Sequence, residues 1–312
     1  MHAMRWIWAM ILVVVTILPA RGADSILLAT GVRGGNQYSV GGAICRFVNL
    51  YHPSGCVIVP TDGTLDNLYA LGLGDVNFAI LQADVQRAAQ GGGGGIAGAY
   101  GDLRSVASVY PEMLTIVTRR DSTIARLADL AGRRVAAGSV NAGARWTLLS
   151  ALHAIGLREA DLATLLPHSD GIAATALCAG TIDAMVLMTG HPSATMSRIG
   201  QTCPVRVVGL SADEMGAVVG SNPAYRPISV PPGLYPFVPR PVPTIGTDAT
   251  IATFASTPDA QVERILGAIF DDVEAFRRQQ FVLAPVLWPD ETRTAPLHPA
   301  ARRFYRARIP VR

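Results

Sequence analysis

Short apolar runs alternate with helical patterns through most of the chain, and this alternation is the strongest constraint on the fold. It is typical of an α/β protein whose parallel sheet is covered on both faces by helices. The length of 312 residues favours two domains rather than one. The predicted strands are Ile26–Thr30, Val57–Val59, Val76–Leu81, Met113–Thr118 and Arg134–Ala137, and the predicted helices are Val40–Leu50, Leu65–Leu71, Asp84–Gln90 and Arg145–Ile155.

The pattern restarts near the middle of the chain, which indicates two similar lobes in succession. The segment "LCAGTIDAMVLM" repeats the arrangement of "LGLGDVNFAILQ", in which a leucine ends a helix, a glycine follows and an apolar strand comes next. We therefore predict a first lobe from residues 24–113 and a second lobe from 114–243, with 244–312 returning to the first. The proline-rich segment Asn222–Pro243 is interpreted as a surface wrap, and Pro258–Arg278 as one amphipathic helix.

The N-terminus has the features of an export signal. Arg5 supplies a positive start, and the apolar stretch Ile7–Leu18 is too short to span a bilayer but suits a signal peptide. Residues 1–22 are the predicted signal, with cleavage after Gly22 or Ala23. No later segment is long and apolar enough to cross a membrane, so we expect a periplasmic protein.

Four cysteines remain in a chain expected to reach an oxidising compartment, where an even number favours disulfides. Three pairings are possible. The local one, Cys45 with Cys56 and Cys178 with Cys203, closes short loops and keeps each bridge within one region. Free buried thiols are the alternative. Zinc is disfavoured because no cysteine has a second ligand at the usual spacing.

The composition excludes several kinds of chemistry. The chain contains no lysine, so a G-K-[ST] phosphate loop and a lysine Schiff base are both impossible. The arginines are scattered, which gives no sign of nucleic-acid binding. The G-x-S-x-G, H-E-x-x-H and C-x-x-C motifs are absent as well. We predict no enzymatic activity, no metal and no cofactor.

The stretch "ILLATGVRGGNQYSVGGAICRFV" joins the first strand to the first helix through a glycine-rich turn. Gly35 lets the backbone approach a ligand closely, and Asn36, Gln37 and Tyr38 follow it. Ser39 is expected to cap the helix. The free N–H groups at such a helix start bind carboxylates as well as phosphates. The alternative is a simple tight turn.

Four further turns are expected at the carboxyl ends of strands, where ligands bind in open α/β sheets. Three of their residues also have purely structural interpretations: Asp84 as a helix cap, Arg145 as a surface arginine and His191 as part of a turn. We expect all five turns to line one crevice. The candidate residues of the four turns are Thr61, Asp62, Thr64 and Asn67; Gln82 and Asp84; Ser139, Asn141, Gly143 and Arg145; and His191.

Taken together and in order, these turns resemble the TAXI family, the extracytoplasmic solute receptors of one branch of TRAP transporters. The resemblance rests on "ATGVRGGNQYSVGGAI", on "PTDGT" with the later Asn67, and on "LQAD", "GSVNAGAR", "GHP" and "APLHPAARRFY". It covers nearly the whole chain after the signal. The four cysteines fall where many relatives have them.

The resemblance implies a two-lobed periplasmic binding protein of type II topology, with the ligand cleft between the lobes. It also implies a monomer that captures a small organic acid or amino-acid-like carboxylate and delivers it to a TRAP-type membrane permease. On this view the carboxylate lies between Asn36, Gln37 and Tyr38 of one lobe and the guanidinium of Arg145 from the other. Tyr38 would add an apolar wall with a polar tip.

The sequence departs from the family pattern at the second turn, where Asp62 replaces a glycine. Because a buried unpaired carboxylate is costly, Asp62 should face solvent or meet a cation. The ligand is therefore expected to differ from simple glutamate and to carry an amine or a larger apolar body. Two other functions stay open: a ligand sensor that signals through a membrane kinase, and a secreted enzyme on a similar scaffold.

Overall fold

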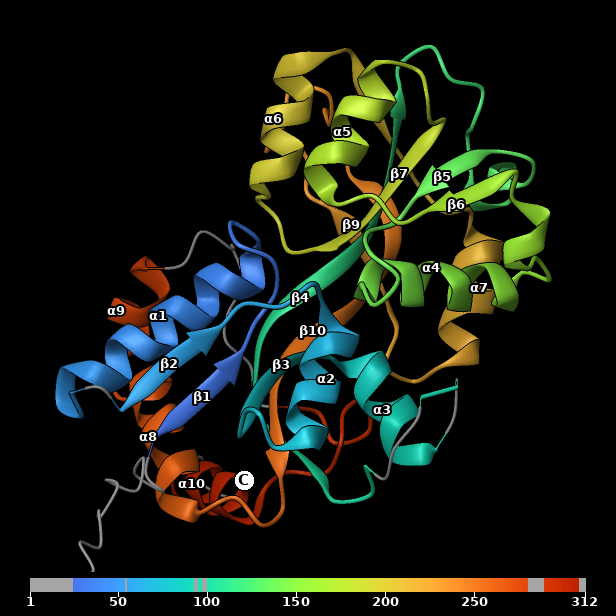
Figure 1. Ribbon diagram of the computed structural model, residues 1–312. Coiled ribbons are helices and arrows are strands. Elements are labelled where there is room, and N and C mark those ends of the chain that lie inside the picture. The colour runs from blue at the N-terminus through green and yellow to red at the C-terminus, as the bar shows by residue number, and fades with distance from the viewer. Residues whose placement is uncertain (1–24, 54, 93–94, 97–99, 280–288, 309–312) are drawn as a thin grey trace, which may run out of the picture.

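The computed structural model describes residues 25–53, 55–92, 95–96, 100–279 and 289–308. The predicted signal peptide lies outside these residues. Within them, no helix combines the length and apolar character needed to cross a bilayer. Figure 1 shows two groups of elements joined by long strands, which is the two-lobed α/β architecture expected from the sequence.

One sheet of ten strands runs through both groups, in the order β2-β1-β3-β10-β4-β7-β5-β6, with β8 paired to β4 and β9 paired to β10. The strands β1 and β3 pair in parallel, as do β5 and β7, which confirms the predicted βα alternation in each group. The bounds are β1 (Ile26–Ala29), β2 (Cys56–Val59), β3 (Phe78–Gln82), β4 (Leu103–Arg119), β5 (Arg134–Ala136), β6 (Thr164–Leu166), β7 (Ala184–Thr189), β8 (Val205–Val208), β9 (Arg226–Val230) and β10 (Val242–Phe254).

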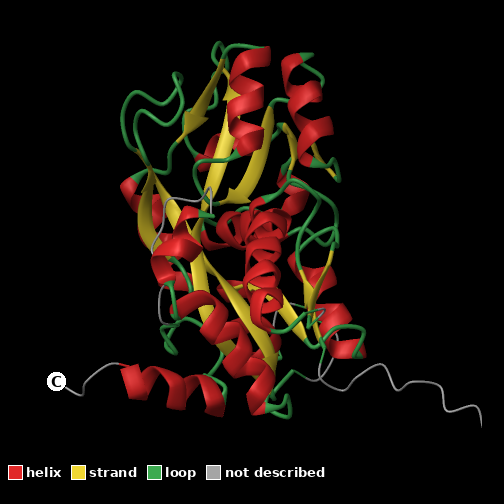
Figure 2. Cartoon of the chain, turned by 90° about the vertical axis from the view of Figure 1, so that its left-hand side faces the viewer, coloured by secondary structure: helices red, strands yellow, loops and turns green. Residues whose placement is uncertain are grey.

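The two long strands β4 and β10 belong to both lobes. The early part of β4 pairs with the late part of β10 beside β3, while β4 from Met113 onward pairs with β7 and β8. Figure 2 shows long strands running along the molecule between its two ends. The chain therefore crosses between lobes on two adjacent, hydrogen-bonded strands. The exact lobe boundaries at 113/114 and 243/244 stay a prediction.

Helices cover both faces of the sheet in each lobe, and each face has its own apolar core. In the first lobe, α1, α8 and α10 pack on one face and α2 and α3 on the other; in the second, α4 and α7 oppose α5 and α6 (Figure 1). The bounds are α1 (Asn36–Tyr51), α2 (Thr64–Leu73), α3 (Ala83–Gly91), α4 (Gly143–Ala154), α5 (Asp170–Cys178), α6 (Ala194–Thr202), α7 (Ala212–Ser221), α8 (Asp259–Phe270), α9 (Val273–Arg278) and α10 (Pro299–Arg308).

Both predicted disulfides are present. Cys45 of α1 is bonded to Cys56 of β2, and Cys178 at the end of α5 to Cys203 after α6. Each bridge ties elements of one lobe only. Among the described residues no cysteine is free.

Three local predictions were wrong. The proline-rich segment 222–243 contains β9, which pairs with β10, and it buries Tyr235. The amphipathic segment 258–278 is two helices, because Asp272 caps the second one by accepting a hydrogen bond from the N–H of Ala275. Ser39 is not the cap of α1, since that helix already begins at Asn36. The hydroxyl of Ser39 instead donates to the carbonyl of Gly35.

Candidate functional site

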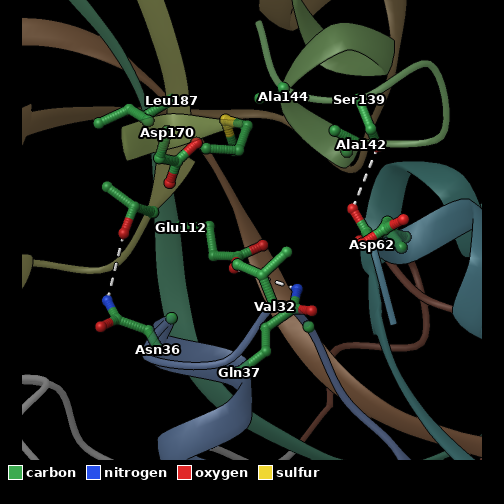
Figure 3. Close-up of a pocket in the computed structure, with 18 of the residues that line it drawn as sticks. Val32, Asn36, Gln37, Asp62, Glu112, Ser139, Ala142, Ala144, Asp170 and Leu187 are labelled. Carbon is green, nitrogen blue, oxygen red and sulfur yellow. Dashed lines mark hydrogen bonds between the residues drawn. The ribbon is translucent and has the colours of Figure 1, made fainter. Parts of the chain in front are cut away.

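A cavity lies where the two lobes meet, and all five predicted turns contribute to it (Figure 3). Its volume is about 150 Å³, which is room for a small solute. Residues from the first lobe and residues from the second share its wall. The lining residues are Gly31, Val32, Gly35–Gln37, Asp62–Thr64, Gln82, Glu112, Gly138, Ser139, Ala142–Ala144, Ser169, Asp170 and Leu187–Thr189.

Four helices begin at this cavity: α1, α2, α4 and α5. The residues that precede them, Gly35, Gly63, Ala142 and Ser169, all line it, and none of them caps its helix with a side-chain hydrogen bond. A helix start carries free N–H groups and a partial positive charge. Four such ends at one cavity give it a wall of backbone N–H groups that favours an anion, although the N–H of Leu65 at the start of α2 is already bonded to the carbonyl of Asn141.

The first turn connects the lobes on one side of the cavity. The side-chain amide of Asn36 donates to the hydroxyl of Thr189 at 3.2 Å and to the carbonyl of Gly190 at 2.7 Å, both at the end of β7 (Figure 3). The amide of Gln37 donates to a carboxylate oxygen of Glu112 at 3.3 Å. The predicted residues Gly35, Asn36 and Gln37 are thus brought to the cavity.

The second and fourth turns connect the lobes on the other side. Ser139 donates its hydroxyl hydrogen to the carbonyl of Asp62, and the N–H of Leu65 donates to the carbonyl of Asn141. Gly63 has a φ of 150°, and a Cβ there would lie 2.9 Å from the Cα of Ala142. Glycine is required at this position because the two backbones touch. The side chain of Asp62 is exposed, which is one of the two expected outcomes for it.

A buried polar chain extends from the cavity wall between the lobes. Thr64 donates to Gln82, whose amide donates to Thr147 of α4 at 3.2 Å. Thr147 and Tyr225 then donate to the same carboxylate oxygen of Asp84, each at 2.8 Å, and the N–H of Val85 donates to the other oxygen. Burial raises the pKa of Asp84, and these hydrogen bonds oppose the rise.

Glu112 lies at the point where β4 passes from one lobe to the other, and its side chain is 3 % exposed. Its Oε1 accepts hydrogen bonds from the Tyr110 hydroxyl at 3.1 Å and from Gln37, while its Oε2 has no partner among the described residues. Burial raises the pKa of Glu112 to about 8; the hydrogen bonds from Tyr110 and Gln37 oppose that rise, and the charges of Asp84 and Asp248 add to it.

Sequence reasoning missed both Glu112 and Asp170. The available signal for Glu112 was a single acidic residue inside an otherwise apolar strand run, "SVYPEMLTIV". Asp170 is the first residue of α5 and is half-buried at the cavity. Burial raises the pKa of Asp170, and the charge of Arg198 opposes that rise.

Seven predicted site residues do not line the cavity. Thr61 donates to Asn67 at 2.6 Å, so these two residues brace the second turn from behind. Tyr38 accepts a hydrogen bond from Arg33 at 3.2 Å. His191 is buried between Thr115 and Tyr235, and this burial lowers its pKa to about 4. The full set is Tyr38, Thr61, Asn67, Asp84, Asn141, Arg145 and His191.

Arg145 is the most consequential of these corrections. Its guanidinium is paired with Glu159 and donates to the carbonyl of Leu165 at 3.3 Å, on the side of α4 that faces β6. It therefore does not present its charge to the cavity. Among the described residues that line the cavity there is no arginine and no histidine, whereas three are carboxylates: Asp62, Glu112 and Asp170. The role of Arg145 as a carboxylate anchor stays a prediction, and in this structure its guanidinium is paired with Glu159 instead of lining the cavity.

The sequence from 28 to 307 matches the model of the NMT1-like family. This chain belongs to the NMT1-like family. Solved structures with the same fold include the GluR0 ligand-binding core from Nostoc punctiforme in complex with L-glutamate. That structure is 13% identical and has a TM-score of 0.53, and the match covers 81% of this chain and 96% of that one.

Two further structures share the fold of this NMT1-like protein. A TctC solute-binding protein from Polaromonas is 17% identical with a TM-score of 0.51, and the match covers 85% of this chain and 90% of that one. A histidine kinase sensor domain with similarity to periplasmic binding proteins is 16% identical with a TM-score of 0.51, covering 85% and 98%. These similarities establish the two-lobed fold of solute-binding proteins.

Proposed function

We propose that this NMT1-like protein is a periplasmic solute receptor of the TAXI type, which captures a small organic acid or amino-acid-like carboxylate and delivers it to a TRAP-type permease. The observation that carries the proposal is the convergence of four uncapped helix starts on one cavity between two lobes. Such an arrangement binds an anion without needing a cationic side chain. The chain is proposed to bind its solute without converting it.

The carboxylate of the solute is proposed to bind the backbone N–H groups of these helices in place of Arg145. Hydrogen bonds between N–H groups and a charged acceptor are shorter and stronger than neutral ones. The N-terminal turns of α1 and α2 come from the first lobe, and those of α4 and α5 from the second. A solute held by both sets would favour the closed arrangement of the lobes.

The lobes are joined on both sides of the cavity, which is the arrangement of a closed receptor. Asn36 reaches Thr189 on one side, and Ser139 reaches Asp62 on the other. Opening would break these polar contacts and the buried hydrogen bonds from Thr147 and Tyr225 to Asp84, and it would bend β4 and β10, the described strands that cross between the lobes. Hinge closure on a few crossing segments is a common means of ligand capture. The two disulfides fit an oxidising compartment.

The proposal is tested by measuring binding to the purified chain without residues 1–23. Thermal unfolding is followed in the presence of a panel of small carboxylates, with and without amino groups, and hits are confirmed by calorimetry. A ligand at about 100 times its dissociation constant stabilises the folded chain by about 2.7 kcal/mol, a readily measured shift. If uncharged analogues such as the amides bind as well as the acids, the anion site is refuted.

A second function is favoured by one comparison. A sensor domain of a histidine kinase shares the fold, so capture of the same solute could be coupled to signalling rather than to transport. Reconstituted uptake separates the two. Vesicles that contain the permease are given the labelled solute with and without this protein. A transport receptor increases uptake when it is added, whereas a sensor leaves uptake unchanged.

A further inference from the structure

One oxygen of Glu112 is unusual among the buried polar atoms around the cavity. Oε1 accepts two hydrogen bonds, from Tyr110 and Gln37, whereas Oε2 is buried, has no partner and belongs to a residue that lines the cavity. In Figure 3 the carboxylate of Glu112 lies between Val32 and Gln37 of the first lobe and Asp170 of the second. A buried polar atom without a hydrogen-bond partner is costly, so a group supplied by a ligand would remove a penalty as well as add a contact.

Among the described residues, no cationic side chain lines the cavity or is hydrogen-bonded to Oε2 of Glu112. The charged and titratable residues around Glu112 are Tyr110 on its own strand, Asp84 of α3, Asp248 of β10 and Asp170 of α5. Asp248 is itself paired with Arg226 of β9 at 2.6 Å. Asp62, at the rim, adds a third carboxylate to the wall. The side chains of the cavity are therefore acidic, while its helix starts are electropositive.

We propose that Glu112 is the specificity-determining residue of the cavity and selects solutes that carry an ammonium group, which donates a hydrogen bond to Oε2. This inference rests on the proposed receptor function and narrows the ligand to a zwitterion. The carboxylate of the solute binds the helix starts, and its ammonium group binds Glu112, with Asp170 as a second negative neighbour. A charged pair formed in a desolvated site is stronger than the same pair in water.

The assignment has a thermodynamic signature. Because the pKa of Glu112 is about 8 in its buried position, this carboxyl group is mainly protonated near neutral pH. An ammonium group stabilises the ionised form, so binding should expel the proton from Glu112 into solution. A solute that instead accepts a hydrogen bond from the protonated carboxyl group would release no proton. Proton release thus distinguishes the two modes of contact.

The experiment compares matched pairs of probes on the purified chain. The panel contains the standard protein amino acids, β-alanine and 4-aminobutyrate, each paired with the acid in which hydrogen replaces the amino group. Thermal shift identifies binders, and calorimetry in two buffers of different ionisation enthalpy measures the protons released at about pH 6.5. We expect amine-bearing members to bind, their partners to bind about 100-fold more weakly, and close to one proton to be released per solute.

Two variants complete the test. Glu112→Gln should reduce the preference for the amine at least tenfold and abolish proton release, because glutamine cannot ionise. Glu214→Gln is the matched control. This buried glutamate accepts hydrogen bonds from the N–H groups of Ala128 and Ser211 in the second lobe and lies outside the cavity. The preference for the amine and the number of protons released should therefore be unchanged in this variant. If Glu112→Gln fails to fold, the inference is decided by the affinities of Glu112→Asp and of the wild type for the matched probe pairs.

Three outcomes overturn the inference. Equal binding of an amine-bearing solute and its partner would show that the ammonium group is not selected. Binding only of acids without the amine would leave the receptor function standing and refute the role of Glu112. Absence of binding by every member of the panel would refute both.

Discussion

Two buried carboxylates lie where the lobes meet, and they differ in how their oxygens are used. Both oxygens of Asp84 accept hydrogen bonds, from Thr147 and Tyr225 of the second lobe and from its own helix. Glu112 has both its donors on one oxygen and leaves the other to the cavity. The comparison teaches that a buried acid with hydrogen bonds to both oxygens, such as Asp84, holds the lobes together. A half-satisfied acid, with hydrogen bonds to one oxygen only, such as Glu112, is available to a ligand.

The largest expected effect concerns the pH dependence of stability at Glu112. Its pKa is about 8 in the folded chain against an ordinary value of 4.5, so the unfolded chain ionises first as pH rises and the wild type loses stability across this window. The Glu112→Gln variant has no such loss of stability, because glutamine does not ionise. Urea titrations give the free energy of unfolding of Glu112→Gln minus that of wild type at each pH. This difference should grow between pH 4.5 and about 8, by at most roughly 5 kcal/mol.

A difference that stays constant across this window would contradict the half-satisfied state of Glu112. His191 contributes a slope of opposite sign, because its folded pKa of about 4 lies below the ordinary value of 6.5 and stability rises with pH between them. That contribution is the same in both proteins. It therefore cancels in the comparison of Glu112→Gln with wild type.

The next effect concerns Asp84. Asp84→Ala leaves the hydroxyl groups of Thr147 and Tyr225 without their acceptor and opens a small cavity, so it should lower the free energy of unfolding by about 3 kcal/mol in denaturant titration. Asp62→Ala is the control, since its side chain is exposed, and should change stability by less than about 0.5 kcal/mol. Equal effects of the two variants would show that Asp84 does not hold the lobes together.

Asn36 tests the contact between lobes without a buried charge. Asn36→Ala removes the hydrogen bonds to Thr189 and Gly190, which should weaken binding of a confirmed solute by about five- to tenfold in calorimetry, equivalent to about 1 kcal/mol. Asn49→Ala removes two hydrogen bonds to Cys56 within the first lobe and should lower stability while leaving affinity unchanged. Unchanged affinity of the Asn36 variant would argue against closure through this contact.

The smallest effect is expected at Arg145. Since its guanidinium is paired with the half-exposed Glu159 and faces away from the cavity, Arg145→Ala should lower the free energy of unfolding by at most about 1 kcal/mol and change affinity by less than about twofold. Calorimetry with the same solute measures this. A tenfold loss of affinity would restore Arg145 as the anchor and weaken the role given to the helix starts.

The sequence was sufficient to predict the fold and the five turns but not the chemistry of the cavity. Apolar periodicity and turn glycines are local signals, and they indicated the strand-to-helix turns that contain Gly35, Gly63 and Gly143. The environment of Glu112 depends on β10 and α3, which are distant in sequence, so its burial could not be read locally.

The orientation of the Arg145 side chain could not be read from the sequence for the same reason. Its position in a turn with the right residue types was predicted, but the direction of its side chain is set by a glutamate fourteen residues later on a short 3₁₀ helix, Glu159–Asp161. Similarly, Asp84 was expected to cap a helix or touch the ligand, and instead meets Thr147 and Tyr225 from the other lobe. Partners that come from elsewhere in the chain decide what a polar residue does.

The contact of Gly63 with Ala142 has a consequence for testing the proposed closure of the lobes. At this seam the backbones of the two halves touch with no room for even a methyl group. A valine side chain in place of Gly63 would clash with the backbone of Ala142 and keep the two lobes apart, whether or not a solute is bound. Substitution at Gly63 would thus give a permanently open form, with which solute binding by the wild type can be compared.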